Sequence, residues 1–162
     1  AVTVNVETVE LPNGKVADYE VIHHPGGAAV VAIDAANRVC LLRQYRPAVR
    51  DWVWEVPAGR LEPGEPPLET ARRELVEEAG LKAGRWRELG SILSSPGVFA
   101  EVLHLYLAEE LIEVPDHRED YEVFEVHWVA FADALARART GDITDAKTLA
   151  GLFRAAAIVG QP

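Results

Sequence analysis

Three glutamates in one segment of the chain could bind a divalent cation. Glu74, Glu77 and Glu78 lie close together in a stretch of strong helix formers. Residues i and i+4 share one face of a helix, so Glu74 and Glu78 point together and Glu77 lies beside them. Like charges at this spacing, near the C-terminal end, destabilise a helix. Mg²⁺ or Mn²⁺ would offset that cost, because these ions prefer oxygen ligands. The alternative is a solvated acidic face, partly neutralised by Arg72 and Arg73.

The chain that carries these glutamates has the composition of a single globular domain, which we assign to residues 1–162. Of its 162 residues, 49% are hydrophobic and 26% are charged. Sixteen basic and 26 acidic residues give a net charge of −10, which disfavours binding to nucleic acid. The longest apolar runs are too short to span a membrane, and no signal peptide is visible. The single cysteine, Cys40, excludes an internal disulfide and fits a cytoplasmic protein.

The periodicity of apolar residues predicts an α+β fold. The glutamates fall in a predicted helix over residues 68–79, with Leu68, Ala71, Leu75 and Ala79 on one face and Gly80 ending it. Two further helices are predicted over residues 131–139 and 144–158. The predicted strands cover residues 2–9, 16–24, 28–33, 39–45, 52–56, 86–93, 102–108 and 123–131. Mixed strands and helices in this order predict a layered arrangement around one core.

The spacing around the three glutamates resembles the Nudix box, here residues 59–81. Seven identities and two aliphatic positions at fixed spacing are specific enough that chance agreement has a probability on the order of 10⁻⁷. The matching positions are Gly59, Glu65, Arg73, Glu74, Leu75, Glu77, Glu78, Gly80 and Leu81. The resemblance implies a Nudix fold, in which a mixed β-sheet core is sandwiched between helices, here preceded by N-terminal antiparallel strands. It also implies hydrolysis of a nucleoside diphosphate linked to another group.

The resemblance implies roles for individual residues of the box. The implied metal ligands, for two or more Mg²⁺ or Mn²⁺ ions per site, are the backbone carbonyl of Ala58 and the side chains of Glu74, Glu77 and Glu78. Glu77 is implied either as a ligand or as a catalytic group that orients water. Arg73 resembles the arginine that pairs with the box carboxylates, with Glu65 as its structural partner.

Further segments resemble the ADP-ribose pyrophosphatase subfamily. Pro96 follows Gly80 at the subfamily's spacing, and residues 43–47 and 55–59 are also similar, although a Pro-Gly turn between strands is a common structural feature. The implied substrate-binding residues are Arg43, Arg46, Glu55, Pro96, Gly97 and Glu101. Because strand residues alternate between faces, only one of the two arginines should face the site, and we prefer Arg43. Glu55 lies between apolar residues and, if buried, needs a cationic partner or a nucleotide amine.

The subfamily also uses a catalytic carboxylate from a mobile loop. Glu122 aligns best with it, and Glu119 is the second choice, against the alternative of a solvated acidic loop. Glu101 is expected near the terminal ribose, although its usual acidic predecessor is Ala100 here.

The sequence therefore predicts Mg²⁺-dependent hydrolysis of ADP-ribose to AMP and ribose 5-phosphate. Its alternatives are a pyrophosphatase for GDP-mannose or ADP-glucose, and a non-catalytic Nudix-fold module that binds nucleotides. The resemblance also implies a homodimer in which the N-terminal strands, residues 1–25, take part. The expected partner is a small nucleoside diphosphate sugar, with no nucleic acid and no membrane.

Overall fold

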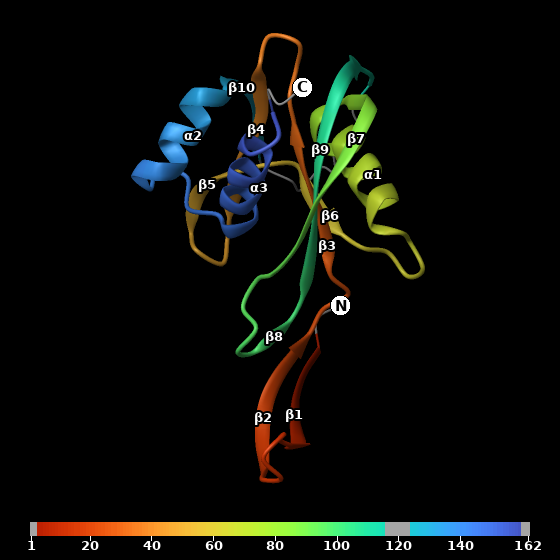
Figure 1. Cartoon of the computed structure of the whole chain (residues 1–162), viewed down its shortest axis with the longest axis vertical. Helices are drawn as coiled ribbons and strands as arrows, with labels where there is room; N and C mark the ends of the chain where they lie inside the picture. Colours follow the sequence, from red (N-terminus) through yellow and green to blue (C-terminus); the bar gives the residue numbers. More distant parts are fainter. Residues whose placement is uncertain (1–2, 116–123, 160–162) are drawn as a thin grey trace.

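The computed structural model describes residues 3–115 and 124–159, arranged as a layered body with a projecting hairpin (Figure 1). The strands are β1 (Thr3–Glu10), β2 (Val16–His23), β3 (Gly27–Ala32), β4 (Arg38–Arg46), β5 (Asp51–Glu55), β6 (Ala58–Arg60), β7 (Leu81–Leu93), β8 (Phe99–Ala100), β9 (Val102–Glu113) and β10 (Phe124–Ala130). The helices are α1 (Pro67–Ala79), α2 (Phe131–Thr140) and α3 (Ala146–Ala156). None of the helices in the described ranges is long and apolar enough to cross a membrane.

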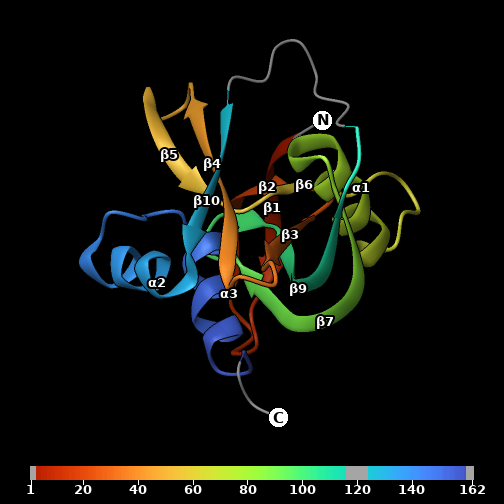
Figure 2. The same ribbon diagram turned by 90° about the horizontal axis from the view of Figure 1, so that it is seen from above.

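A mixed sheet forms the centre of the body, with the strand order β6-β3-β9-β7. β3 runs parallel to β9, whereas β6 and β7 pair with their neighbours in antiparallel fashion. Every residue of β3 is buried, because helices cover both faces of the sheet. Ala29 and Val31 belong to the cluster that includes α3, and Ala28 and Val30 belong to the cluster that includes α1. Figure 2 shows α1 and α3 on opposite sides of β3, which confirms the predicted sandwich.

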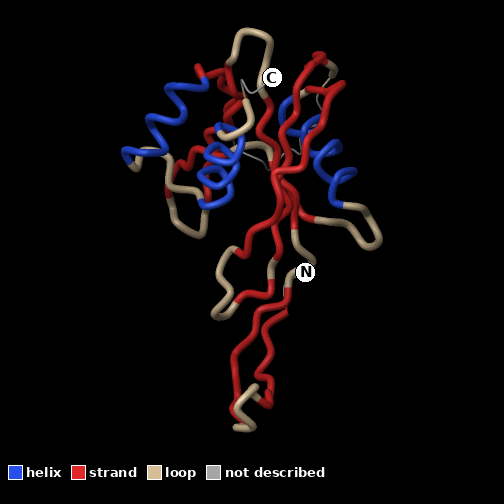
Figure 3. The backbone as a smooth tube through the Cα atoms, viewed as in Figure 1, coloured by secondary structure: helices blue, strands red, loops and turns tan. Residues whose placement is uncertain are grey.

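Two smaller sheets complete the fold. One is antiparallel, in the order β10-β4-β5, and packs beside α2. The other joins the β1–β2 hairpin to the short parallel strand β8, and the hairpin extends away from the body (Figure 3). The side chains of Val4, Val6 and Val16 on this hairpin are more than half exposed. The predicted N-terminal antiparallel strands are therefore confirmed, and they carry apolar surface that the body does not cover.

α1 has clear start and stop signals. Pro66 and Pro67 suit the first turn, where no intrahelical N–H is needed. Gly80 ends the helix in the left-handed conformation, with φ of 63°, and its N–H bonds to the carbonyl of Val76 at 3.0 Å. Ala71 and Leu75 are fully buried against the central sheet, and Glu78 lies on the same buried side. The predicted helix is confirmed to within one residue.

The sequence prediction missed parts of the sheet. The predicted strands over residues 86–93 and 102–108 are too short, since β7 and β9 pair from Leu81 and Glu113 to Leu93 and Val102, with a register shift between Glu88 and Gly90. Backbone pairing between β7 and β9 therefore continues beyond the segments in which the sequence alternates. The short strands β6 and β8 were also missed, because two or three residues cannot show a period.

Candidate active site

Two glutamates of α1 meet the strand β6. The Ala58 N–H donates a hydrogen bond to Glu78 Oε2 at 2.8 Å, and Glu78 is only 4% exposed. The carboxylate of Glu74 lies against the next residue, where a Cβ on Gly59 would stand 1.8 Å from Glu74 Oε1. Glycine at this position is therefore what allows the carboxylate to approach the strand. As the i and i+4 spacing predicts, both glutamates face the same short segment.

Arg73 holds the carboxylates of this helix in place. It donates to both oxygens of Glu65, at 3.1 and 3.0 Å, which confirms the predicted pairing. Its Nη1 also donates to Glu74 at 2.7 Å and to Glu77 at 3.0 Å. The hydrogen bonds from Arg73 lower the pKa of Glu65 to about 2, against a partial opposing effect of burial. In turn Glu65 raises the pKa of Arg73, so both groups remain charged.

The donor set around β6 suits a hard divalent cation. The Glu74 and Glu78 carboxylates approach Ala58 and Gly59, and Glu77 is joined to Glu74 through Arg73. Within residues 3–115 and 124–159, no three acidic, histidine or cysteine side chains are yet gathered closely enough to hold an ion. An ion would therefore be held by carboxylates that shift relative to Arg73, together with the Ala58 carbonyl.

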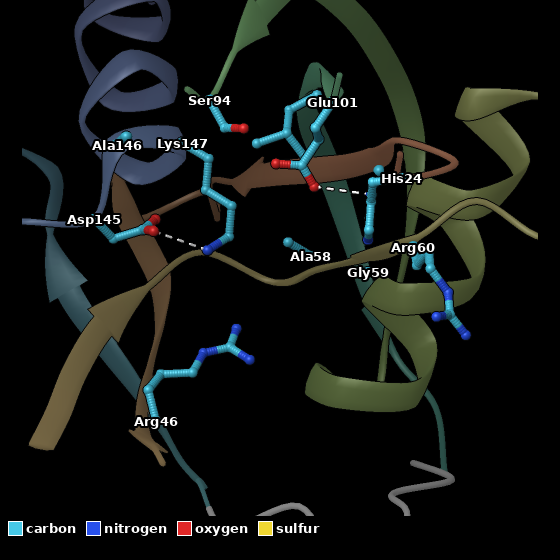
Figure 4. Close-up of a pocket in the computed structure, with 12 residues that line it drawn as sticks. His24, Arg46, Ala58, Gly59, Arg60, Ser94, Glu101, Asp145, Ala146 and Lys147 are labelled. Carbon is cyan, nitrogen blue, oxygen red and sulfur yellow. Dashed lines mark hydrogen bonds and ion pairs between the residues drawn. The ribbon is translucent and has the colours of Figure 1, made fainter. Parts of the chain in front are cut away.

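A pocket of about 350 Å³ opens beside β6 (Figure 4). Ala58, Gly59 and Arg60 form part of its wall, although the Arg60 side chain extends away from the other side chains in the close-up. Six further polar or charged residues line the pocket, and they form two groups. One group is Arg46, Asp145 and Lys147, and the other is His24, Ser94 and Glu101.

The first group is organised around a buried carboxylate. Glu55 is 2% exposed, and Arg46 donates to both its oxygens, at 2.6 and 2.7 Å. Lys147 also donates to Glu55, and to Asp145 at 3.0 Å. Burial alone would raise the pKa of Glu55, but Arg46 and Lys147 lower it overall, so it stays ionised. The predicted need for a cationic partner of Glu55 is thus met twice.

The start of α3 is fastened to the strand that carries Glu55. Asp145 caps the helix by accepting from the Thr148 N–H at 3.0 Å and from the Thr148 hydroxyl at 2.6 Å. The same hydroxyl accepts from the Val56 N–H at 2.9 Å. Lys147, Asp145 and Thr148 were not predicted as site residues. The only signal in the sequence is an acidic residue at the start of the helix predicted over residues 144–158, which identifies a cap and not a site.

The second group lies at the ends of three strands. Ser94 follows β7, Glu101 follows β8, and His24 follows β2. His24 Nδ1 stands 3.0 Å from Glu101 Oε1, and the two side chains are 15% and 12% exposed. The Gly26 N–H donates to the same nitrogen at 3.1 Å. Glu101 therefore borders the pocket, whereas His24 and Ser94 were missed because isolated residues of these types carry no spacing signal.

Other predicted site residues lie elsewhere. Arg43 is exposed and stacks over Trp52, with its guanidinium carbon 5.3 Å from the ring centroid. Arg46, on the opposite face of β4, lines the pocket, so this geometry favours Arg46 over Arg43, the reverse of our preference from the sequence. Pro96 and Gly97 line a separate groove against the β1–β2 hairpin. Two predicted catalytic residues, Glu119 and Glu122, lie outside the described residues.

Comparisons with known proteins match the chain to one family and one fold. The family model described as "NUDIX domain" matches residues 23–152. An ADP-ribose pyrophosphatase of Bacillus subtilis (strain 168) is 41% identical over 145 residues, which cover 88% of this chain and 78% of the relative. An ADP-ribose pyrophosphatase of Mycobacterium tuberculosis is 36% identical over 155 residues, covering 94% of this chain and 75% of the relative. A solved structure, "Crystal structure of ADP compounds hydrolase", matches with a TM-score of 0.78 and 23% identity, covering 96% of this chain and 92% of that one.

Proposed function

Because the chain belongs to the NUDIX domain family, we propose that it hydrolyses ADP-ribose to AMP and ribose 5-phosphate. The single observation that carries the proposal is the approach of Glu74 and Glu78 to Ala58 and Gly59, at the edge of a pocket with a cationic side. Enzymes of this family generally depend on a divalent metal. In the reaction, the oxygen of a water molecule bonds to one phosphorus and the bridging P–O bond at that phosphorus breaks, so the bridging oxygen leaves on the other phosphate; both protons of the water are released when the two phosphate monoesters are dianions.

We assign the metal to the carboxylates of α1. Glu74, Glu78 and the Ala58 carbonyl would hold it, Glu77 would be a further ligand, and two or more ions per site fit a diphosphate. Bound Mg²⁺ or Mn²⁺ would neutralise the diphosphate and lower the pKa of a water molecule. Arg73, which donates hydrogen bonds to Glu74 and Glu77, would hold these two carboxylates close to each other until they turn towards the ion.

The pocket supports roles for two cationic side chains, and the loop carboxylate remains a proposal from the resemblance. Arg46 and Lys147 are both oriented by Glu55, so their positive charge is available to a substrate phosphate at the side of β6. Glu122, with Glu119 as the second choice, remains our proposal for the loop carboxylate that accepts a proton.

We also propose a homodimer in the cytoplasm. The exposed valines of the β1–β2 hairpin offer an apolar surface that a second copy of the chain would cover. A hairpin alone is only marginally stable, so pairing with another copy would also support it. Equilibrium sedimentation tests this proposal, because Val4→Asp and Val6→Asp should shift the chain towards monomer.

A substrate panel tests the activity. The chain is incubated with Mg²⁺ and ADP-ribose, ADP-glucose or GDP-mannose, and products are identified by mass. ADP-ribose should be cleaved fastest, and Glu78→Gln should lose at least about 100-fold in kcat, because a metal-binding carboxylate is removed. The matched control, Glu69→Gln, changes an exposed glutamate of the same helix and should retain activity.

The other outcomes are equally informative. If GDP-mannose or ADP-glucose is cleaved fastest, the proposed substrate ADP-ribose is wrong, but the proposed hydrolysis of a diphosphate bond stands. Tight binding of ADP-ribose without turnover by the folded wild-type chain would indicate a binding module and refute the proposed enzyme.

A further inference from the structure

The carbonyl of Ala58 faces the free edge of the central sheet. The Pro57 carbonyl accepts a hydrogen bond from the Val30 N–H of β3 at 2.8 Å. Because the backbone groups of successive strand residues point in opposite directions, the N–H and carbonyl of Ala58 face away from β3. The Ala58 N–H accordingly donates to Glu78 of α1 at 2.8 Å. β6 is the edge strand of this sheet, so the Ala58 carbonyl is directed outwards on the side of the α1 carboxylates.

The residues just before Ala58 are anchored to the start of α3. The Val56 N–H donates to the Thr148 hydroxyl at 2.9 Å, and the two residues are 1% and 0% exposed, so water does not compete for this bond. The hydroxyl in turn donates to Asp145 at 2.6 Å, which fixes its rotation. Lys147, which also binds Asp145, donates to Glu55. Two adjacent residues of α3 therefore hold two adjacent residues of the segment that leads into β6.

Loss of the Thr148 hydroxyl would release one end of this segment. The Val56 N–H would be buried without a partner, and the cost of that state drives the backbone to move towards another acceptor or water. Pro57 has a fixed φ, so a shift at Val56 is passed on to Ala58. The Ala58 carbonyl would then move relative to the carboxylates of α1, which belong to a different element.

We propose that Thr148 is a positioning residue for the metal ion: through the Val56 N–H it fixes where the Ala58 carbonyl lies relative to the carboxylates of α1. The proposal rests on the proposed function, which assigns the metal to these groups. Thr148 is fully buried, so it acts through the backbone and does not contact the substrate. Removing a direct partner of a metal ligand typically weakens metal binding about 10- to 100-fold. Thr148 acts two residues away from the ligand, so we expect a smaller effect, about 3- to 10-fold.

Mn²⁺ binding in the absence of substrate tests the proposal. Free Mn²⁺ is measured by electron paramagnetic resonance during titration of the full chain, at a temperature where circular dichroism shows each variant to be folded. Thr148→Val replaces the hydroxyl with a methyl group and should raise the Kd for Mn²⁺ about 3- to 10-fold. Thr148→Ala removes the hydroxyl without placing a methyl group against the Val56 N–H and should raise the Kd over the same range, about 3- to 10-fold. Thr148→Ser keeps the hydroxyl, so its Kd should stay within about 2-fold of the wild-type value.

Leu152→Ala is the matched control for stability. Leu152 lies on the same helix and is fully buried in the core, and its side chain cannot form a hydrogen bond to the segment that leads into β6. The cavity left by this substitution should lower the melting temperature at least as much as Thr148→Val does. The Kd for Mn²⁺ should nevertheless stay within about 2-fold of the wild-type value, because the Val56 N–H keeps its acceptor.

Turnover of ADP-ribose gives a second measurement that a general loss of stability would not reproduce. Thr148→Val should need about 3- to 10-fold more Mg²⁺ to reach half of its maximal kcat. At saturating Mg²⁺, its KM for ADP-ribose should change less than about 2-fold, because Arg46 and Lys147 are still oriented by Glu55.

The proposal is overturned if Thr148→Val and Thr148→Ala bind Mn²⁺ as tightly as the wild-type chain, or if Thr148→Ser is weakened as much as they are. It is also overturned if Leu152→Ala is weakened equally, or if neither Thr148→Val nor Thr148→Ala folds, because the hydroxyl would then serve the whole fold. If the wild-type chain binds Mn²⁺ but cleaves no nucleotide sugar, the proposed function fails, and the Mn²⁺ titrations still decide the role of Thr148. If the wild-type chain binds no Mn²⁺, the metal assignment and this proposal are both rejected.

Discussion

Replacing Arg73 with alanine should destabilise the fold far more than replacing its neighbour Arg72. Arg73 donates five hydrogen bonds, of which four go to the carboxylates of Glu65, Glu74 and Glu77 and one to the Arg60 carbonyl. A hydrogen bond to a charged group contributes about 1.5–3 kcal/mol when well buried. Arg73 is 27% exposed, so solvent screening reduces that contribution, and we expect a total loss of about 2–3 kcal/mol.

Arg72→Ala is the matched control. Among the described residues, Arg72 forms an ion pair with Glu69 only, with side chains 48% and 52% exposed, and it stacks over Trp86 at 5.9 Å. Exposed pairs of this kind contribute about 0–1 kcal/mol. In thermal unfolding, Arg73→Ala should lower the melting temperature by about 4–12 °C and Arg72→Ala by at most about 4 °C. Equal losses in the two variants would refute the role given to Arg73.

The pH dependence of the same variant gives a second measurement. The pKa of Glu65 is about 2 in the folded chain, below its ordinary value of 4.5. The unfolded chain therefore binds the proton at higher pH, so this stabilisation is complete above the ordinary pKa and is lost as the pH falls towards the folded pKa. Between about pH 5 and about pH 3, urea unfolding of Arg73→Ala should show a smaller fall in stability than that of the wild-type chain. An identical fall in both would contradict the assigned cause.

Three further perturbations have definite expected outcomes. Gly59→Ala should lower kcat at least about 100-fold in a turnover assay, because the new Cβ would overlap Glu74 Oε1; wild-type kcat would show that the close approach is irrelevant. Lys147→Gln should raise KM for the substrate about 10-fold or more, because Glu55 would keep its charge while one of its two cations is lost; an unchanged KM would exclude Lys147 from phosphate binding. Cys40 should resist thiol reagents until the chain unfolds, since burial raises the pKa of its thiol to about 12; rapid labelling of the native chain would contradict its burial.

The sequence predicts the parts of the site that have regular spacing. The carboxylates of α1 could be placed because i and i+4 positions share a helical face, and the residue that ends the helix is a glycine. Arg73 and Glu65 could be paired from the box resemblance, and the structure confirms their contact.

The parts that depend on tertiary packing could not be predicted. Lys147 and Glu55 are 92 residues apart in the chain and meet only because α3 packs against the segment that follows β5. The choice between Arg43 and Arg46 depends on which face of β4 turns towards the pocket. Alternation places the two arginines on opposite faces of the strand but does not say which face that is. His24, Ser94 and Glu101 line the same pocket because the strands that they follow end close together. No local sequence pattern predicts this proximity.

The hydroxyl of Thr148 has a consequence for the order in which the protein can be assembled during synthesis. It bridges Val56 to the start of the last helix, across 92 residues of chain. A ribosome-bound chain that has emerged only as far as β10 contains every carboxylate of the box. It lacks α3, and therefore the hydrogen bond from the Val56 N–H to the Thr148 hydroxyl just before Ala58. Truncated products of translation should therefore be inert even when they contain the whole motif, because α3 holds in place the segment that leads into β6.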